Sequence, residues 1–136
     1  MNDTAGETLS VAVEREFAHP PEKIWRALTQ PHLIEEWLMK SDFRPVVDHR
    51  FAFRGDWGAV DCQVLVVEPL ETLTYTWGAM GVETVVTWTL TPTRAGTLLR
   101  MEQSGFRPDQ RQAFQGAKVG WRNFLESLDS VLRRTA

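Results

Sequence analysis

The pattern of hydrophobic and polar residues changes its period along the chain. Residues 8–17 alternate between apolar and polar positions, which predicts a half-buried β-strand over Thr8–Phe17. Residues 21–38 repeat instead at intervals of three and four, so we predict two short helices there. Pro21 and Pro31 begin these helices, because a proline at the first helical position loses no hydrogen bond.

A period of two returns after Asp42 and continues as far as Ser104, which predicts further strands. We place them at Pro45–Arg54, Ala59–Val67, Thr72–Trp77, Glu83–Thr91 and Thr97–Ser104. The links between them are short and most of them contain glycine, as in an antiparallel meander. Apolar residues at steps of three and four then predict one long helix over Pro108–Arg133.

This order of elements predicts an α+β fold with a curved antiparallel six-stranded sheet wrapped around a long C-terminal helix. Two short helices are expected between the first and second strands. The apolar face of such a sheet must be covered, and the long helix is the predicted element large enough to cover it. The 136 residues suit a single domain, residues 1–136, with its core over about 8–134.

Side-chain parity along each predicted strand indicates which residues face the helix, because successive side chains point to opposite faces. The inward positions include Val47, His49, Phe51 and Phe53 on one strand, and Val60, Cys62, Val64 and Val66 on the next. Polar residues with inward parity are Arg15, His49, Tyr75 and Gln103. Such an interior is either a packed aromatic core or a ligand cavity with a few polar groups, and parity alone favours the core.

Charge and composition limit the partners of the protein. Fifteen basic and eighteen acidic residues give a net charge of −3, which argues against a nucleic-acid partner because phosphate binding needs a concentrated basic face. The lone Cys62 allows no internal disulfide and fits a reducing compartment. The polar N-terminal sequence has no signal-peptide pattern, and no apolar run is long enough to span a bilayer. We therefore expect a cytoplasmic protein without a membrane partner, either a monomer or a weak homodimer.

Four segments of the sequence resemble one protein family. They are HPPEKIWRALTQPHLIEEW, VVEPLETLTYTW, TWTLTPTRAGTLLRMEQSGF and GWRNFLESL. In this order and spacing they are similar to the START-like (SRPBCC, helix-grip) superfamily. Within it, they resemble the single-domain bacterial homologues of the activator of the heat-shock-protein-90 ATPase. The segment DHRFAFRGDWGAVDCQV departs from the family pattern, since it lacks the glycine pair common before the second strand.

The resemblance implies a cavity between sheet and long helix that binds a small hydrophobic or aromatic molecule, such as a lipid or a polyketide. We expect its surround to be Trp37, His49, Phe51, Phe53, Tyr75, Trp77, Trp88, Met101, Phe114, Val119, Gly120 and Trp121. Gly116 and Gly120 lie one turn apart in the predicted long helix, where glycine is unfavourable. They indicate either a close approach of helix and sheet or room for a ligand.

No residue pattern indicates catalysis or a metal centre. His19, His32 and His49 fall on different predicted elements, and no HExxH, CxxC, GxSxG or glycine-rich phosphate motif occurs. We therefore expect no metal, no cofactor and no catalytic residue.

Three functions remain open at this point. Non-catalytic ligand binding is preferred. A polyketide cyclase or aromatase could use the same pocket, with His49 and Tyr75 as candidate acid–base groups. The family resemblance also allows co-regulation of a chaperone ATPase in a stress response.

Overall fold

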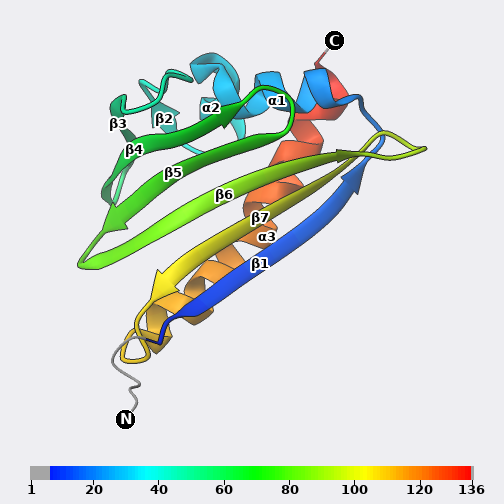
Figure 1. Ribbon diagram of the computed structural model, residues 1–136. Helices are drawn as coiled ribbons and strands as arrows, with labels where there is room; N and C mark the ends of the chain where they lie inside the picture. The colour runs from blue at the N-terminus through cyan, green and yellow to red at the C-terminus, as the bar shows by residue number, and fades with distance from the viewer. Residues whose placement is uncertain (1–6, 136) are drawn as a thin grey trace.

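The strands of the protein form one antiparallel sheet, and the computed structural model describes it with its helices over residues 7–135 (Figure 1). The elements are β1 (Leu9–Phe17), α1 (Pro21–Thr29), α2 (Pro31–Trp37), β2 (Lys40–Ser41), β3 (Arg50–Gly55), β4 (Gly58–Glu68), β5 (Thr72–Ala79), β6 (Val82–Pro92), β7 (Thr97–Phe106) and α3 (Arg111–Arg134). In this part of the chain the sheet has seven strands, in the order β1-β7-β6-β5-β4-β3-β2. The predicted α+β architecture is confirmed.

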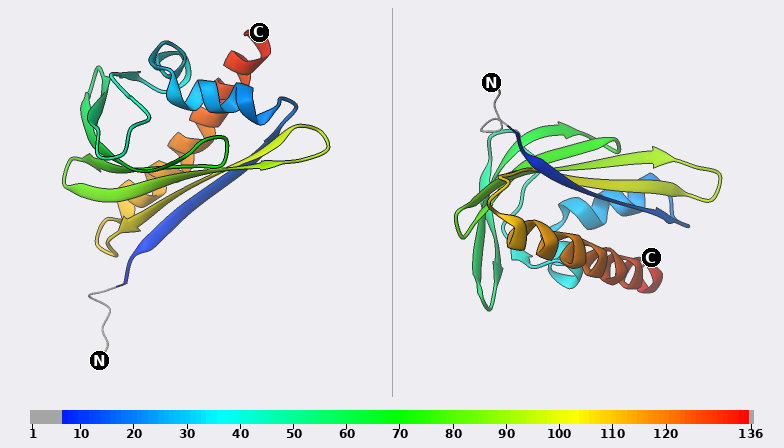
Figure 2. Two further views of the ribbon diagram at one scale, coloured as in Figure 1. Left: turned by 45° about the horizontal axis from the view of Figure 1, so that its top comes forward. Right: turned by 90° about the horizontal axis from the view of Figure 1, so that it is seen from below.

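The long helix α3 packs against the inner face of the curved sheet, as predicted (Figure 2). It lies chiefly along β1, and its C-terminal end packs against α1 and α2. Two polar contacts hold this end. Lys23 Nζ donates a 2.7 Å hydrogen bond to the carbonyl of Thr135, and Arg134 forms an ion pair with Glu36. The two short helices thus close one end of the sheet–helix space.

The number of strands and the start of the long helix differ from the prediction. A short additional strand, β2, pairs with β3 through Lys40 opposite Arg54, so the sheet has one strand more than the six predicted. The helix α3 begins at Arg111 rather than at Pro108. Residues 107–110 form a turn before the helix. In this turn the backbone N–H of Arg107 donates to Oε1 of Gln110 over 2.9 Å.

The strand predicted from Pro45 begins only at Arg50. Residues 46–49 form a turn instead, closed by a hydrogen bond from the N–H of His49 to the carbonyl of Val46. Asp48 in this turn has a φ of 74°, which breaks the extended conformation that side-chain parity assumes. Val47 is therefore exposed, and its predicted inward position is wrong.

A β-bulge in β4 changes which side chains face the interior. Val64 lies opposite Tyr75 whereas Val66 lies opposite Thr74, so Leu65 is the extra residue. The alternation shifts by one position after the bulge, and Val66 is 38% exposed. The predicted inward position of Val66 is wrong, while the predicted inward residues before the bulge are buried.

The core between sheet and helices is rich in aromatic side chains. Its buried rings are those of Phe17, Trp37, Phe43, Phe51, Phe53, Tyr75, Trp88, Phe106 and Trp121. Trp88 Nε1 donates to Tyr75 Oη over 2.9 Å, and Trp37 Nε1 donates to the carbonyl of Ala27 over 2.8 Å. Within residues 7–135 no buried side-chain nitrogen or oxygen lacks a hydrogen-bond partner.

None of the helices that the structure describes is both long enough and apolar enough to cross a bilayer.

Candidate ligand-binding cavity

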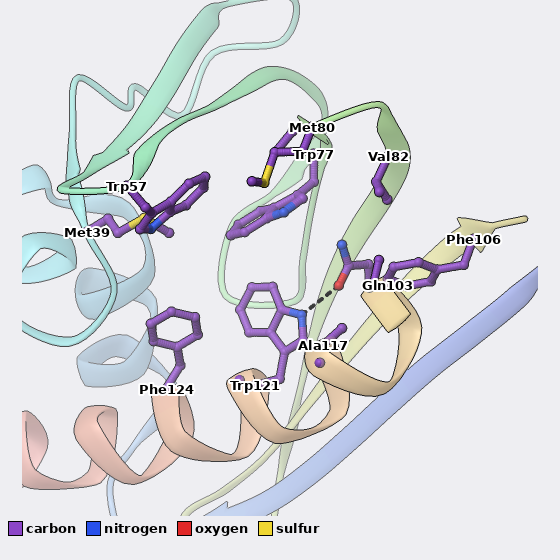
Figure 3. A pocket seen from close by; sticks show the side chains of 14 residues that line it. Met39, Trp57, Trp77, Met80, Val82, Gln103, Phe106, Ala117, Trp121 and Phe124 are labelled. Atoms are coloured by element: carbon purple, nitrogen blue, oxygen red, sulfur yellow. Dashed lines mark hydrogen bonds between the residues drawn. The ribbon is translucent and has the colours of Figure 1, made fainter. Parts of the chain in front are cut away.

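An apolar cavity of about 450 Å³ lies between the first half of α3 and the ends of two β-hairpins (Figure 3). It is lined by Met39, Trp57, Trp77, Ala79, Met80, Val82, Gln103, Phe106, Ala113, Gly116, Ala117, Gly120, Trp121 and Phe124. Small-molecule pockets in proteins have volumes of roughly 300–1,000 Å³ and mostly apolar walls. The size and lining of this cavity therefore suit a small organic molecule.

Part of the wall contributed by α3 is built from its smallest residues. Ala113, Gly116, Ala117 and Gly120 are spaced by three or four positions and so lie on one face of the helix. A Cβ atom added to Gly116 or Gly120 would meet no atom within 4 Å. Of the two interpretations of these glycines, the close approach of helix and sheet is wrong, because the space beside them is open.

A chain of hydrogen bonds forms the floor of the cavity. Trp121 Nε1 donates to Gln103 Oε1 over 2.7 Å, and Gln103 Nε2 donates to Thr84 Oγ1 over 2.8 Å. The hydroxyl of Thr84 in turn donates to the carbonyl of Trp77 over 2.9 Å. These bonds connect α3, β7, β6 and β5, so the floor is fixed by four elements. Gln103 is thus inward-facing, as its parity predicted, and only 2% exposed.

Aromatic rings connect the cavity wall to the core. The ring centroids of Trp77 and Trp121 are 5.0 Å apart, and those of Trp121 and Phe124 are 5.5 Å apart. Trp77 also packs at 5.3 Å on the buried ring of Phe53. Distances in this range are typical of favourable aromatic pairs. The wall is therefore continuous with the core and preformed.

Two large apolar side chains lie exposed at the opening of the cavity. Trp57 belongs to the turn between β3 and β4 and is 55% exposed, and Met80 belongs to the turn between β5 and β6 and is 84% exposed. Figure 3 shows both on the side of the cavity that faces away from α3. Exposed apolar residues gathered at one place commonly mark a contact surface for a ligand or partner. These two side chains extend the apolar lining to the protein surface.

None of the side chains that line the cavity, within residues 7–135, is ionisable. General acid–base catalysis requires a titratable group within hydrogen-bond reach of the substrate. In the same part of the chain, no three His, Cys, Asp or Glu residues gather closely enough to hold a metal ion. What this arrangement offers is shape, aromatic surface and a few fixed hydrogen-bonding groups.

The candidate acid–base groups lie outside the cavity lining. Tyr75 is buried in the core, where burial raises the pKa of its hydroxyl well above the usual range. His49, which directly precedes β3, has its Nε2 atom 3.1 Å from the carbonyl oxygen of Asp42. Arg15 faces α3, as its parity predicted, but forms an ion pair with Asp129 over 3.3 Å.

The structure brings Trp77, Gly120 and Trp121 together in the cavity lining, and places the other predicted site residues elsewhere. Those buried in the adjoining core are Trp37, Phe51, Phe53, Tyr75, Trp88 and Met101. Those outside both regions are His49, Phe114 and Val119. Phe114 packs on Phe106 at 5.7 Å, and Val119 is 56% exposed on α3. Parity identified inward residues but not which part of the interior is filled.

Sequence reasoning missed the residues at the opening of the cavity. Trp57 and Met80 occupy the turn sequences Gly-Asp-Trp-Gly and Gly-Ala-Met-Gly, which it assigned only as hairpin links. A large apolar residue at the tip of a hairpin is the signal that could have found them, because turn tips are normally polar. Met39, Val82, Phe106 and their neighbours in the lining carry no comparable sequence signal.

The chain matches a known protein family over most of its length. The family model described as "Activator of Hsp90 ATPase homolog 1-like protein" matches residues 18–133. No curated protein gives a significant match to the chain.

Several solved structures share the fold and most of the chain. Protein MLL2253 from Mesorhizobium loti is 61% identical, with a TM-score of 0.92, covering 94% of this chain and 99% of that protein. CalU16 from Micromonospora echinospora is 29% identical, with a TM-score of 0.81, covering 95% of this chain and 77% of CalU16. DynU16, described as a putative protein in the dynemicin biosynthetic locus, is 26% identical with a TM-score of 0.84. That match covers 92% of this chain but 47% of DynU16, so the chain spans about half its length.

Proposed function

The chain belongs to the family of activator of Hsp90 ATPase homolog 1-like proteins, and we propose that it binds a small apolar or aromatic molecule in the cavity beside α3. The observation that carries this proposal is a space of about 450 Å³ whose lining is almost entirely apolar. Water in such a space forms few hydrogen bonds, so its replacement by an apolar molecule is favourable. This lining supports binding as the function.

The composition of the wall suggests an aromatic ligand in particular. Trp77, Trp121 and Phe124 offer neighbouring ring faces and edges, which pair favourably with a further ring. Met39 and Met80 add flexible, polarisable side chains that adapt to different ligand outlines. A wall of this kind supports the binding of planar molecules with modest selectivity for shape.

The two alternative functions would make other demands on the molecule. A cyclase or aromatase needs a titratable group at the substrate, and the cavity lining within residues 7–135 provides none. Co-regulation of a chaperone ATPase would depend on an outer surface rather than on this cavity. DynU16, a putative protein in the dynemicin biosynthetic locus, shares this fold, which supports a role around a small organic molecule.

The proposal is tested by titrating ¹⁵N-labelled protein with fluorene, a flat tricyclic hydrocarbon that is smaller than the cavity. The indole N–H signals of Trp57, Trp77 and Trp121 should shift saturably. Those of Trp25 and Trp37, which do not line the cavity, should stay in place.

Gly120→Leu supplies the matched variant, because its side chain would occupy the open space beside Trp121. We expect it to weaken fluorene binding by roughly tenfold or more, since a filled site no longer accepts the ligand. Val119→Leu, at the neighbouring exposed position, should bind like the unmodified protein. Unmoved Trp77 and Trp121 signals at saturating fluorene, or full binding by the Gly120→Leu variant, would contradict the proposal.

A further inference from the structure

The polar side-chain atoms of the cavity are mostly hydrogen-bond donors, whereas many ligand sites offer both donors and acceptors. The side-chain nitrogens of the lining belong to three tryptophans and to Gln103. An indole N–H is a donor without any acceptor capacity, and a side-chain amide nitrogen is also only a donor. The sulfur atoms of Met39 and Met80 are weak acceptors. The strong hydrogen-bonding groups of the lining that remain free for a ligand are therefore mainly donors. This holds when the side-chain amide of Gln103 keeps one orientation.

The hydrogen bonds of the floor fix that orientation. Trp121 Nε1 can only donate, so the Gln103 atom 2.7 Å from it must be the amide oxygen. The amide nitrogen then faces Thr84 Oγ1 at 2.8 Å and donates to it. Thr84 is free to accept because its own hydrogen goes to the carbonyl of Trp77. Reversing the amide would place two donors against each other, so Gln103 holds one orientation.

Besides the indole N–H of the exposed Trp57 at the opening, two donors remain for a ligand inside the cavity. Gln103 Nε2 carries a second hydrogen, and within residues 7–135 its one hydrogen-bond partner is Thr84. Trp77 Nε1 has no hydrogen-bond partner in that part of the chain. Because no buried side-chain nitrogen there lacks a partner, and Trp77 is only half-buried, its N–H must be accessible. Trp77 and Thr84 are paired across β5 and β6, which brings the two donors to one side of the cavity (Figure 3).

From this arrangement we infer that the cavity selects an uncharged aromatic compound bearing a carbonyl oxygen, which accepts hydrogen bonds from Gln103 Nε2 and Trp77 Nε1. This inference rests on the proposed binding function and adds the ligand class to it. A carboxylate is disfavoured, because no cationic side chain within residues 7–135 lines the cavity to compensate its desolvation. A protonated amine is disfavoured because it can only donate hydrogen bonds and would bring further donors against the donors of the cavity.

The test compares three tricyclic probes of nearly the same shape: fluorene, 9-fluorenone and fluorene-9-carboxylate. Affinities come from titration calorimetry or from the indole signals. We expect 9-fluorenone to bind roughly tenfold more tightly than fluorene, as one or two added hydrogen bonds would give. Fluorene-9-carboxylate should bind more weakly than either. The infrared carbonyl stretch of bound 9-fluorenone should lie below its position in an apolar solvent, which reports the hydrogen bonds directly.

Variants separate the donors from the shape of the cavity. Trp77→Phe keeps a ring but removes the N–H, so it should reduce the preference for 9-fluorenone and move the carbonyl stretch upward. Gln103→Met should do the same, with folding checked by circular dichroism. Phe106→Leu, an apolar lining position, should weaken both neutral probes alike and leave their affinity ratio unchanged.

The outcomes distinguish this inference from the function on which it rests. Equal binding of fluorene and 9-fluorenone, or an unshifted carbonyl stretch, would overturn the inference while the binding function stands. Binding of none of the probes would overturn both.

Discussion

The indole nitrogen of Trp121 in α3 donates a 2.7 Å hydrogen bond to the amide oxygen of Gln103 in β7. Both side chains are 2% exposed, so this bond joins helix and sheet out of contact with bulk water. It has two effects on the site. It holds α3 at a distance that keeps the cavity open beside Gly120, and it directs the amide nitrogen of Gln103 away from the helix.

The first prediction concerns the energetic coupling of this pair. Gln103→Leu leaves the Trp121 N–H buried without an acceptor, and we expect it to lower the free energy of unfolding by about 1–3 kcal/mol. Trp121→Phe should also destabilise, through lost packing and an unpaired amide oxygen. The double variant should lose less than the sum of the two, because the second change no longer breaks the bond. Urea unfolding measures all three, and strictly additive losses would contradict a direct bond.

The second prediction concerns the glycines of α3. Gly116→Ala and Gly120→Ala should each raise the free energy of unfolding by about 1 kcal/mol, because alanine favours the helix and the new Cβ meets no atom within 4 Å. Gly105→Ala is the contrasting control. Gly105 has a φ of 107°, which L side chains rarely adopt, so the same change there should destabilise. Urea unfolding distinguishes the signs, and destabilisation at Gly116 or Gly120 would mean that the helix packs closer to the sheet than described.

The third prediction concerns the position of Trp57 at the opening of the cavity. A Cβ atom on Gly55 would lie 2.9 Å from Trp57 Nε1, so Gly55→Ala must displace the indole. We expect the Trp57 indole signal to shift in the free protein and fluorene affinity to fall several-fold, about 1 kcal/mol, through the loss of one aromatic wall.

Two further variants serve as its controls. Trp57→Ala should reproduce the loss of affinity, and the double variant should bind no more weakly than Trp57→Ala alone. An additional loss in the double variant would show that Gly55 acts on the cavity by another route.

The fourth prediction concerns stability in acid. Asp42 Oδ1 accepts the backbone N–H of Ala52 over 3.1 Å, and this bond lowers the pKa of the carboxyl below its ordinary value of 3.8. The folded pKa is thus below the unfolded one, so the contribution of Asp42 is present above about pH 3.8 and is lost as the pH falls through the folded value. Asp42→Asn keeps an acceptor but cannot ionise, so it should flatten this acid dependence.

Urea midpoints between pH 7 and pH 3 measure the effect. Asp56→Asn, on the exposed turn between β3 and β4, is the matched charge control and should leave the acid dependence of stability in place. Parallel pH profiles for the Asp42→Asn variant and the unmodified protein would contradict the prediction.

The fifth prediction concerns Cys62. Its side chain is buried in β4, and burial raises the pKa of the thiol well above its usual range, which disfavours the reactive thiolate. Ellman's reagent should therefore label the folded protein about a hundredfold more slowly than a free thiol, with a rate that follows local opening. Rapid labelling in native buffer would contradict this and would show an accessible thiol.

The fold could be predicted because it depends on periodicity. The two helices beginning at Pro21 and Pro31, the meander and the long helix are all present, and most of their boundaries lie close to those expected. The errors lie where a single residue breaks the alternation. Leu65 forms a bulge, and Asp48 adopts a positive φ, and neither event leaves a mark in the hydrophobic pattern.

The site could be predicted less well, for a physical reason. Trp88 in β6 and Trp121 in α3 both face the interior and pack against each other at 5.6 Å, yet only Trp121 lines the cavity. Whether an inward residue is packed or lines a void depends on the volume available opposite it. Here that volume is set by Gly116 and Gly120 of α3, and the parity of side chains along a strand cannot report it.

The pairing of the first strand with the last has a consequence for how the chain folds. Phe17 lies opposite Thr97 and Leu9 opposite Phe106. The first strand, β1, therefore pairs with β7, and nearly the whole meander lies between them in the sequence. The hairpins from β3 to β7 need only short loops to close, whereas β1 must close a very long one, and long loops form later because they cost more chain entropy. The meander is therefore the natural folding nucleus, and β1 docks afterwards. In pulse-labelling hydrogen exchange, amides of β5 and β6 should gain protection before those of β1.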